Sequence, residues 1–330
     1  MKNVLVTGGI GFIGHHLVDY LLKNTDWNVT VLDRIDASSN QSRIFELESF
    51  QNNKERVKFV WHDLRAEVND SVSNFFDSPE IILHLAAGSH VDRSIDDPLM
   101  FVQDNVVGTC NLLNYARTLP NLELFVYFST DEVFGPAEDG ELFKDDDRYN
   151  SGNPYSASKA GGEELAVAFH NTYGLPVIIT HCMNVFGERQ YHEKFIPSTI
   201  RKLNRGETIQ IHCDKNLEIP GSRVYMHAEE VCDALVYIVK KGNVGEKYNI
   251  APVDNYREID NETMALMISE LLDKEIVLER VVDRGSGQGY DLRYGLDGTK
   301  LKNLGWKSNK ELSDYLKQVV EWSMKNERWI

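Results

Sequence analysis

Two short clusters of the sequence carry the side chains that could do chemistry. Ser129-Thr130-Asp131-Glu132 follows an apolar run and puts two adjacent carboxyl groups at the end of an expected strand. Because close like charges push paired pKa values apart, Asp131 and Glu132 could serve as an acid and a base. The same two acids could instead form a solvated cap at the end of the strand.

The second cluster contains Tyr155 and Lys159, four residues apart and hence on one face of an expected helix. We expect the positive charge of Lys159 to lower the pKa of the phenol and its amine to hold a nicotinamide ribose. Tyr155 could then take a hydroxyl proton while hydride leaves the same carbon. A Tyr with a Lys at this spacing is also common on protein surfaces. Its place after a strand, in a chain with a dinucleotide loop, favours the catalytic interpretation.

That loop is the run Thr7–Gly14, between an expected strand and an expected helix. Gly8 and Gly11 would bring backbone N–H groups against a pyrophosphate, and Gly14 would let the helix pack close to the sheet. Asp33 ends the second strand 19 residues after Gly14. Its carboxylate could accept a hydrogen bond from a ribose 2′-hydroxyl and would repel a 2′-phosphate, which predicts NAD, although the adjacent Arg34 favours NADP.

Short apolar runs alternate with helical patterns through the first half of the chain. We predict strands at 3–7, 28–32, 57–61, 81–85, 122–129 and 176–183, and helices at 12–24, 98–118 and 155–173. This alternation predicts an α/β fold, a Rossmann-type doubly wound parallel sheet with a smaller C-terminal α/β substrate lobe. We assign residues 1–184 to an NAD-binding domain and 185–330 to a sugar-nucleotide-binding lobe, with part of 224–250 returning to the first domain.

Composition and charge narrow the class of partner. The chain has 330 residues, with 35 basic and 51 acidic side chains and a formal charge of −16. Such a chain repels nucleic acids and anionic membranes, so neither is an expected partner. The first residues run directly into a strand and leave no room for a signal peptide. Cys110, Cys182, Cys213 and Cys232 are scattered, which predicts reduced thiols and a cytoplasmic protein, and the histidine spacing predicts no metal site.

With these motifs in place, the chain resembles the extended short-chain dehydrogenase/reductases. Within them it is most similar to the nucleoside-diphosphate-sugar 4,6-dehydratase family (dTDP-glucose 4,6-dehydratase-like). The resemblance is carried by residues 7–14, 84–94, 129–135, 153–161 and 193–197. The trio Thr130-Asp131-Glu132 is the specific part, since related 4-epimerases and decarboxylases usually carry other residues there.

The resemblance implies a lyase that uses NAD internally. Tyr155 would take the proton of the sugar 4-hydroxyl as C4 gives up hydride, with Thr130 bonded to the 4-oxygen. Glu132 would then remove the C5 proton and Asp131 would protonate the leaving 6-hydroxyl. Return of the hydride to C6 gives a 4-keto-6-deoxy sugar. The implied substrate is a dTDP- or UDP-hexose, most closely dTDP-glucose. The alternatives are a sugar-nucleotide 4-epimerase, a UDP-sugar decarboxylase and a non-enzymatic dinucleotide-sensing scaffold.

The resemblance also implies contact residues. Cofactor contacts fall on Gly8, Gly11, Phe12, Ile13, Gly14, Asp33, Arg34, Asp63, Leu64, Leu85, Ala86, Ala87, Tyr155 and Lys159. Asp63 could hold the adenine or be an ordinary strand-end residue. Substrate contacts fall on Ser89, Thr130, Asn184, Lys194, Phe195, Arg223, Asn249 and Arg293. Of these, Arg223 and Arg293 would clamp the diphosphate. A homodimer is implied, with a four-helix interface formed by residues 98–118 and 155–173, which carry apolar residues such as Val106, Leu112, Leu113, Leu165 and Val167.

Several positions depart from the family pattern. The family usually has Glu in place of Gly88, Tyr in place of Phe134 and a small hydroxyl residue in place of Asp104. Residues 287–291, where Tyr290 could stack on the base, replace a Pro-Gly-His-Asp stretch, and 214–222 is extra length. The catalytic residues are retained, so these departures affect the expected substrate more than the expected reaction.

Overall fold

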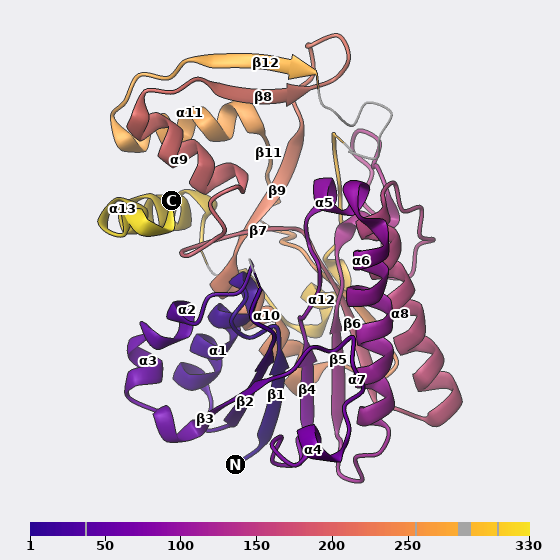
Figure 1. Ribbon diagram of the computed structural model, residues 1–330. Coiled ribbons are helices and arrows are strands. Elements are labelled where there is room, and N and C mark those ends of the chain that lie inside the picture. Colours follow the sequence, from indigo (N-terminus) through magenta and orange to yellow (C-terminus); the bar gives the residue numbers. More distant parts are fainter. Residues whose placement is uncertain (37, 255, 283–291, 309) are drawn as a thin grey trace.

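The computed structural model of the chain describes residues 1–36, 38–254, 256–282, 292–308 and 310–330. Within them the largest element is a seven-stranded parallel sheet with strand order β10-β6-β5-β4-β1-β2-β3 (Figure 1). Its strands are β1 (Asn3–Thr7), β2 (Asn28–Asp33), β3 (Val57–Trp61), β4 (Ile81–His84), β5 (Leu124–Phe128), β6 (Val177–Cys182) and β10 (Lys247–Ile250). The predicted doubly wound α/β fold is confirmed.

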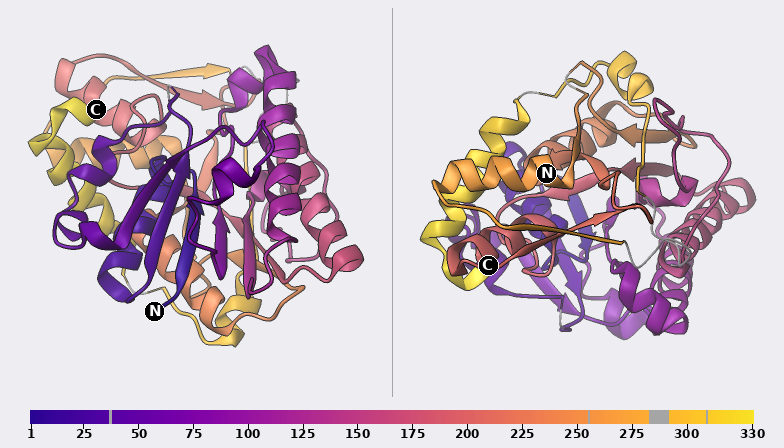
Figure 2. Two further views of the ribbon diagram at one scale, coloured as in Figure 1. Left: turned by 60° about the horizontal axis from the view of Figure 1, so that its bottom comes forward. Right: turned by 90° about the horizontal axis from the view of Figure 1, so that it is seen from above.

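Both faces of this sheet are buried, because successive side chains of a strand point to opposite faces. On β1, Val4 and Val6 pack with α1 (Phe12–Asn24) and α10 (Ala228–Lys241), whereas Leu5 packs with α7 (Gly108–Ala116) and α8 (Pro154–Tyr173). The helices therefore cover the sheet from both sides, as the views in Figures 1 and 2 show. Polar chemistry is left to the ends of the strands.

The chain beyond β6 builds most of a smaller lobe over the carboxyl ends of these strands, in the upper part of Figure 1. This lobe contains β7 (Asn184–Phe186), α9 (Phe195–Arg205), β8 (Ile209–Cys213), β9 (Ser222–His227), β11 (Glu258–Asp260), α11 (Asn261–Leu272), β12 (Leu278–Val282), α13 (Leu312–Lys325) and η4 (Glu327–Trp329). Its strands form two small sheets, β11-β9-β7 and β12-β8. Two elements that lie between β9 and β11 in the sequence belong to the larger domain. Helix α10 packs against α1, and β10 pairs in parallel with β6 at the edge of the large sheet.

Short helices complete the two lobes: α2 (Ser42–Phe45), α3 (Glu48–Gln51), η1 (Lys54–Arg56), α4 (Asp70–Ser73), α5 (Val91–Asp96), η3 (Asp131–Phe134) and α12 (Thr299–Leu304). In the described ranges, no helix combines the length and apolar character needed to cross a membrane, and no group of His, Cys, Asp and Glu side chains could hold a metal ion.

The single helix predicted over 98–118 is instead three segments. These are α6 (Pro98–Val102), a π-helical turn η2 (Gln103–Val107) and α7. The buried Asn105 in η2 accepts a hydrogen bond from Gly88 N (2.8 Å) and donates to Gly88 O (3.0 Å) and Ser158 Oγ (2.8 Å). These three bonds fix the helix to the loop after β4 and to α8, and the wider turn accommodates them.

We predict that Gly162→Ala weakens the contact between α8 and η2. A Cβ at Gly162 would lie 2.5 Å from the Asn105 carbonyl oxygen, a backbone atom with little room to move. The overpacking should lower the free energy of unfolding by about 1–3 kcal/mol. Gly161→Ala is the matched control, because its Cβ would meet only the tip of Val106, at 3.1 Å. Helix propensity favours that change by up to about 1 kcal/mol. Equal losses in the two variants, measured by urea denaturation, would contradict the prediction.

Candidate active site

A cleft of about 330 Å³ opens where the carboxyl ends of the parallel strands meet the smaller lobe. The chain reverses its direction of strand addition between β1 and β4, and ligands of such sheets bind at this switch point. All of the cofactor residues expected from the sequence line the cleft: Gly8, Gly11, Phe12, Ile13, Gly14, Asp33, Arg34, Asp63, Leu64, Leu85, Ala86, Ala87, Tyr155 and Lys159. Thr130, Asp131, Glu132, Ser89, Asn184 and Lys194 line it as well.

The glycine loop after β1 has no room for larger residues. Gly8 has a φ of +72°, and a Cβ there would lie 2.8 Å from Ala86 N, while a Cβ on Gly14 would collide with the Gly8 carbonyl oxygen. The helix α1 begins after Gly11 with no side-chain cap and no acidic residue in its first turn. Its first N–H groups therefore present positive charge to the cleft, which fits the pyrophosphate of a dinucleotide.

Asp33 ends β2 beside this loop. One carboxyl oxygen accepts the Ile10 N–H (3.0 Å) and the other accepts from Ser39 Oγ (3.1 Å). Burial raises the pKa of Asp33 to about 6, although both hydrogen bonds lower it. The side chain is still ionised at neutral pH and faces the cleft. There the carboxylate can accept a hydrogen bond from a ribose hydroxyl.

The two adjacent acids lie just past β5, at the start of η3. Thr130 caps this turn: its hydroxyl lies 3.1 Å from Asp131 Oδ1 and accepts from the Glu132 N–H at 3.4 Å. Asp131 is buried, and burial followed by the charge of Glu132 raises its pKa to about 7. Its Oδ2 has no hydrogen-bond partner among the described residues. A buried carboxyl with a proton near neutral pH and an unused oxygen can donate that proton to a ligand.

Tyr155 and Lys159 occupy the first turns of α8, which begins with a capping box of Asn153 and Ser156. The Lys159 ammonium donates to Phe128 O (2.6 Å) and lies over the ring of Tyr127. Burial lowers the pKa of Lys159 to about 7. The start of α8 therefore places in the cleft a phenol and an amine that is about half deprotonated at neutral pH.

The expectation that Lys159 lowers the pKa of Tyr155 does not hold in this structure. Burial, followed by the negative charge of Glu132, raises the pKa of the phenol, and a hydrogen bond with Thr130 lowers it in part. The Lys159 ammonium is directed to the end of β5. Sequence spacing puts the two side chains on one face but does not reveal how strongly that face is desolvated.

Four of the expected substrate residues lie outside the cleft lining: Phe195, Arg223, Asn249 and Arg293. Asn249 is fully buried, and its amide donates to Phe143 O (2.9 Å) and Asp297 O (3.3 Å) while His181 occupies its oxygen. Its side chain is therefore part of the interior polar network around β10, and its expected contact with substrate stays a prediction.

The two arginines expected to clamp a diphosphate have protein partners here. Arg293 contacts Glu258 at 2.9 Å and donates to two backbone carbonyl groups. Arg223 donates to Ser222 O and Leu292 O (both 2.7 Å), and its charge lowers the pKa of Asp131. A diphosphate at Arg293 would have to share the guanidinium with the carboxylate of Glu258.

The departures from the family pattern lie in different parts of the structure. Phe134 is buried and stacks on Phe143, so it is a core residue. Gly88 and Asp104 lie next to each other, since a Cβ at Gly88 would be 3.4 Å from Asp104 Oδ2. The extra length at 214–222 is a tight turn in which Asp214 accepts from the N–H groups of Glu218 and Ile219. The stretch 287–291, with the expected base-stacking Tyr290, lies outside the described residues.

Part of the cleft lining was not predicted from the sequence. The additional residues are Leu32, Asp36, Ser38, Ser39, Arg43, His62, Arg65, Phe128, Cys182, Met183, Val185, Gln190 and Tyr191. The residues that come shortly after Asp33 and Asp63 could have been predicted, because they follow the ends of expected strands. Arg43 and Tyr191 could not, because only the tertiary fold brings their segments to the cleft.

Comparison with known proteins agrees with this geometry. A family model described as GDP-mannose 4,6 dehydratase matches residues 5–319. The low-salt glycan biosynthesis protein Agl12 of Haloferax volcanii is 37% identical over 97% of this chain and 98% of its own length. The dTDP-glucose 4,6-dehydratase of Haemophilus influenzae is 37% identical over 99% of both chains. The crystal structure of DesIV, a dTDP-glucose 4,6-dehydratase from Streptomyces venezuelae with NAD bound, superposes with a TM-score of 0.88 at 33% identity, covering 99% of this chain and 98% of that one. The predicted resemblance is thus confirmed, and the chain belongs to the GDP-mannose 4,6 dehydratase family.

Proposed function

We propose that this chain converts a nucleoside-diphosphate hexose, most closely dTDP-glucose, into its 4-keto-6-deoxy derivative with NAD as the bound cofactor. The observation that carries the proposal is the buried Asp131, whose pKa is about 7, next to Glu132 and in the same cleft as Tyr155 and the glycine loop. Epimerisation at C4 needs a hydride acceptor and one acid–base group. Elimination of water needs a second acid and a second base, and this cleft contains both.

In the proposed reaction, NAD held by the glycine loop and Asp33 would supply a reversible hydride acceptor beside the sugar. Tyr155 takes the proton of the 4-hydroxyl as a phenolate, a form that burial and the charge of Glu132 oppose and that the hydrogen bond with Thr130 favours. Oxidation at C4 makes the C5 proton acidic, and Glu132 removes it. Asp131 donates its proton to the 6-hydroxyl, which leaves as water. As C6 takes the hydride back, Glu132 returns a proton to C5.

We further propose that residues 185–330, without the part of 224–250 that joins the large sheet, bind the sugar nucleotide. The support is that Lys194, the residue before α9, lines the cleft with Ser89 and Asn184. Burial lowers the pKa of Lys194, and the negative charge of Glu132 opposes that shift. A cation here would offset the repulsion that a chain of charge −16 exerts on a diphosphate.

A homodimer through the α6–η2–α7 segment and α8 is also proposed. Leu99, Val102 and Val107 are exposed there, whereas Leu112 and Leu113, two of the residues expected at the interface, are buried in the core of the subunit. Only a sedimenting dimer at micromolar concentration would support this assembly.

The reaction is tested with dTDP-glucose, UDP-glucose and UDP-N-acetylglucosamine in deuterated water. We expect loss of water from dTDP-glucose, with one solvent deuterium at C5 of the product, measured by mass spectrometry and NMR. A change of C4 configuration without water loss would replace the proposal by a 4-epimerase. Carbon dioxide release from a UDP-sugar acid would replace it by a decarboxylase, and binding without turnover would indicate a scaffold.

The roles of the two acids are separated by isosteric amides. We expect Asp131→Asn and Glu132→Gln each to lower kcat by about 10²–10⁴, the range of a lost general acid or base. Asp131→Asn should still exchange the C5 hydrogen for deuterium in unreacted substrate, because Glu132 remains, whereas Glu132→Gln should not. Exchange that survives in Glu132→Gln would reject Glu132 as the base.

The proton on Asp131 also predicts a pH-dependent stability. Its pKa is about 7 in the folded chain against 3.8 for an ordinary Asp, so the folded state binds a proton that the unfolded state has lost. The stability from this proton is fully present below pH 3.8 and is lost as pH rises through 7. Relative to wild type, Asp131→Asn should therefore gain about 2–4 kcal/mol in free energy of unfolding between pH 4 and pH 8. Denaturation of the exposed-site control Asp139→Asn should show no such trend; a flat difference for Asp131→Asn would refute the protonated acid.

A further inference from the structure

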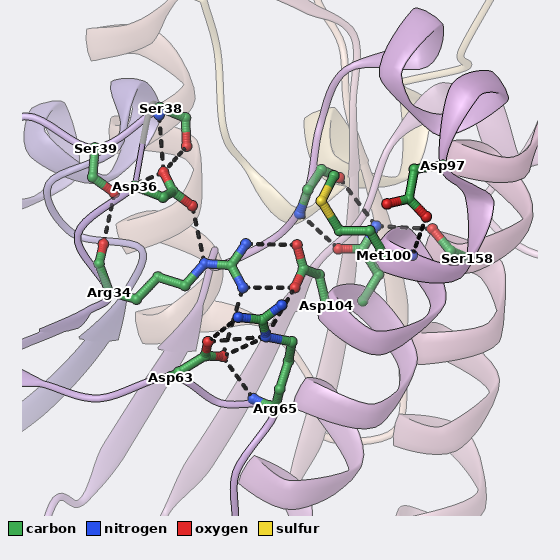
Figure 3. A network of polar contacts seen from close by, with 12 residues as sticks. Arg34, Asp36, Ser38, Ser39, Asp63, Arg65, Asp97, Met100, Asp104 and Ser158 are labelled. Carbon is green, nitrogen blue, oxygen red and sulfur yellow. Dashed lines mark hydrogen bonds and ion pairs between the residues drawn. The ribbon is translucent and has the colours of Figure 1, made fainter.

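Charged side chains gather at one corner of the cleft, between the loops after β2 and β3 and the π-helical turn η2 (Figure 3). Arg34 and Asp36 come from the first loop, Asp63 and Arg65 from the second, and Asp104 from η2. All five line the cleft. We call this group the β2–β3 corner.

Arg34 is held on three sides within this corner. Its Nη1 and Nη2 donate to the two oxygens of Asp104 at 2.7 and 2.6 Å, and its Nε donates to Asp36 at 2.9 Å. The fork of a guanidinium matches the two oxygens of a carboxylate, so this paired geometry is the strong form of the interaction. The Asp104 side chain is only 5% exposed, compared with 28% for Arg34. Arg34 therefore points its donors at Asp104 and away from the open cleft.

The structure also fixes Asp104 in place. Its neighbour Asn105 is tied to both backbone groups of Gly88 and to Ser158. Gly88 lies beside this carboxylate, since an added Cβ there would be 3.4 Å from Asp104 Oδ2 and 3.1 Å from the Phe101 ring. The bidentate pair with Arg34 is the arrangement that this packing holds.

The second arginine of the corner is engaged in the same way. Arg65 Nε donates to Asp63 at 2.9 Å and lies 3.8 Å from Asp104. A ligand that enters the corner therefore meets two guanidinium groups whose charge is already neutralised by carboxylates. The carboxylate of Asp33, at the end of β2, adds further negative charge at this edge of the cleft.

The corner adjoins the position where Asp33 fits a ribose hydroxyl, and an arginine in such a place is the group that accommodates the 2′-phosphate of NADP. Arg34 would be that group if its donors were free. We propose that Asp104 makes the chain selective for NAD over NADP by holding Arg34 in the bidentate ion pair. Arg34 is then a masked phosphate-binding residue and Asp104 a specificity-determining one.

This inference rests only on the dinucleotide part of the proposed function, so its test uses nucleotide binding without any sugar substrate. The protein is equilibrated with equal concentrations of NAD and NADP, separated from free nucleotide, and the bound nucleotides are quantified by chromatography. Asp104→Ser removes the two carboxylate oxygens that accept from Nη1 and Nη2 of Arg34, while the bond from Nε to Asp36 remains. We expect it to raise the ratio of bound NADP to bound NAD by about 10- to 100-fold, the value of one or more charge-assisted hydrogen bonds.

Three further variants sharpen the result. Asp104→Asn keeps the shape of the side chain while it loses the bidentate acceptor, and it should shift the ratio in the same direction. Asp139→Asn removes one negative charge at an exposed site outside the cleft lining and should leave the ratio unchanged. In an Arg34→Ser background, Asp104→Ser should no longer raise the ratio, because the phosphate-binding donor is gone.

Two outcomes would overturn the proposal. One is an unchanged ratio in both Asp104→Ser and Asp104→Asn. The other is an equal rise with and without Arg34, which would mean that Asp104 acts through its charge alone. A shifted ratio in a protein that dehydrates no sugar nucleotide would reject the reaction but keep this inference. Normal dehydration with an unchanged ratio would do the opposite.

Discussion

Burial of the large sheet on both faces is the constraint on which the rest of the structure depends. Strands β1 to β6 of this sheet place apolar side chains toward one helical layer and then the other, so the interior accepts few polar groups that are not fully paired. Parallel strands all finish at the same edge. The loops that leave this edge are therefore where Gly8, Asp33, Asp63, Ala86 and Thr130 can meet in one cleft.

The same burial supplies the chemistry of the cleft. It raises the pKa of Asp131 to about 7 and lowers the pKa of Lys159 to about 7, because a desolvated group resists its charged form. The charge of Glu132 acts in the same direction on Asp131. A carboxylic acid and an amine thus approach the same pKa from opposite directions without a metal ligand or an unusual residue at either position. The environment at the sheet edge, more than the residue types, sets their proton affinity.

Much of the fold and of the cofactor cradle could be predicted from the sequence, for identifiable reasons. Strand and helix periods placed α1 at its observed bounds and β1 and β3 likewise, since each is flanked by clear polar or glycine signals. The glycine loop and Asp33 were found because their spacing is local.

What could not be predicted depends on contacts distant in sequence. The break of residues 98–118 into three segments depends on Asn105 meeting Gly88 and Ser158. The burial of Asn249 in a polar network depends on its contacts with His181 and Asp297. No local sequence pattern shows which of several possible partners will form a hydrogen bond with an amide or a guanidinium group in the folded chain.

The π-helical turn η2 has a consequence for how the two ends of this helical segment relate. Each residue of an α-helix advances the direction of its side chain by about 100°, so the wider turn shifts the phase of α7 relative to α6. Leu112 and Leu113 can then pack into the core of the subunit while Asp104 lines the cleft and Asn105 bonds to Gly88. The turn lets the cleft-facing side of η2 and the core-facing side of α7 keep different side-chain directions. Residues on one of these surfaces can therefore change without rotating the residues of the other surface away from their contacts.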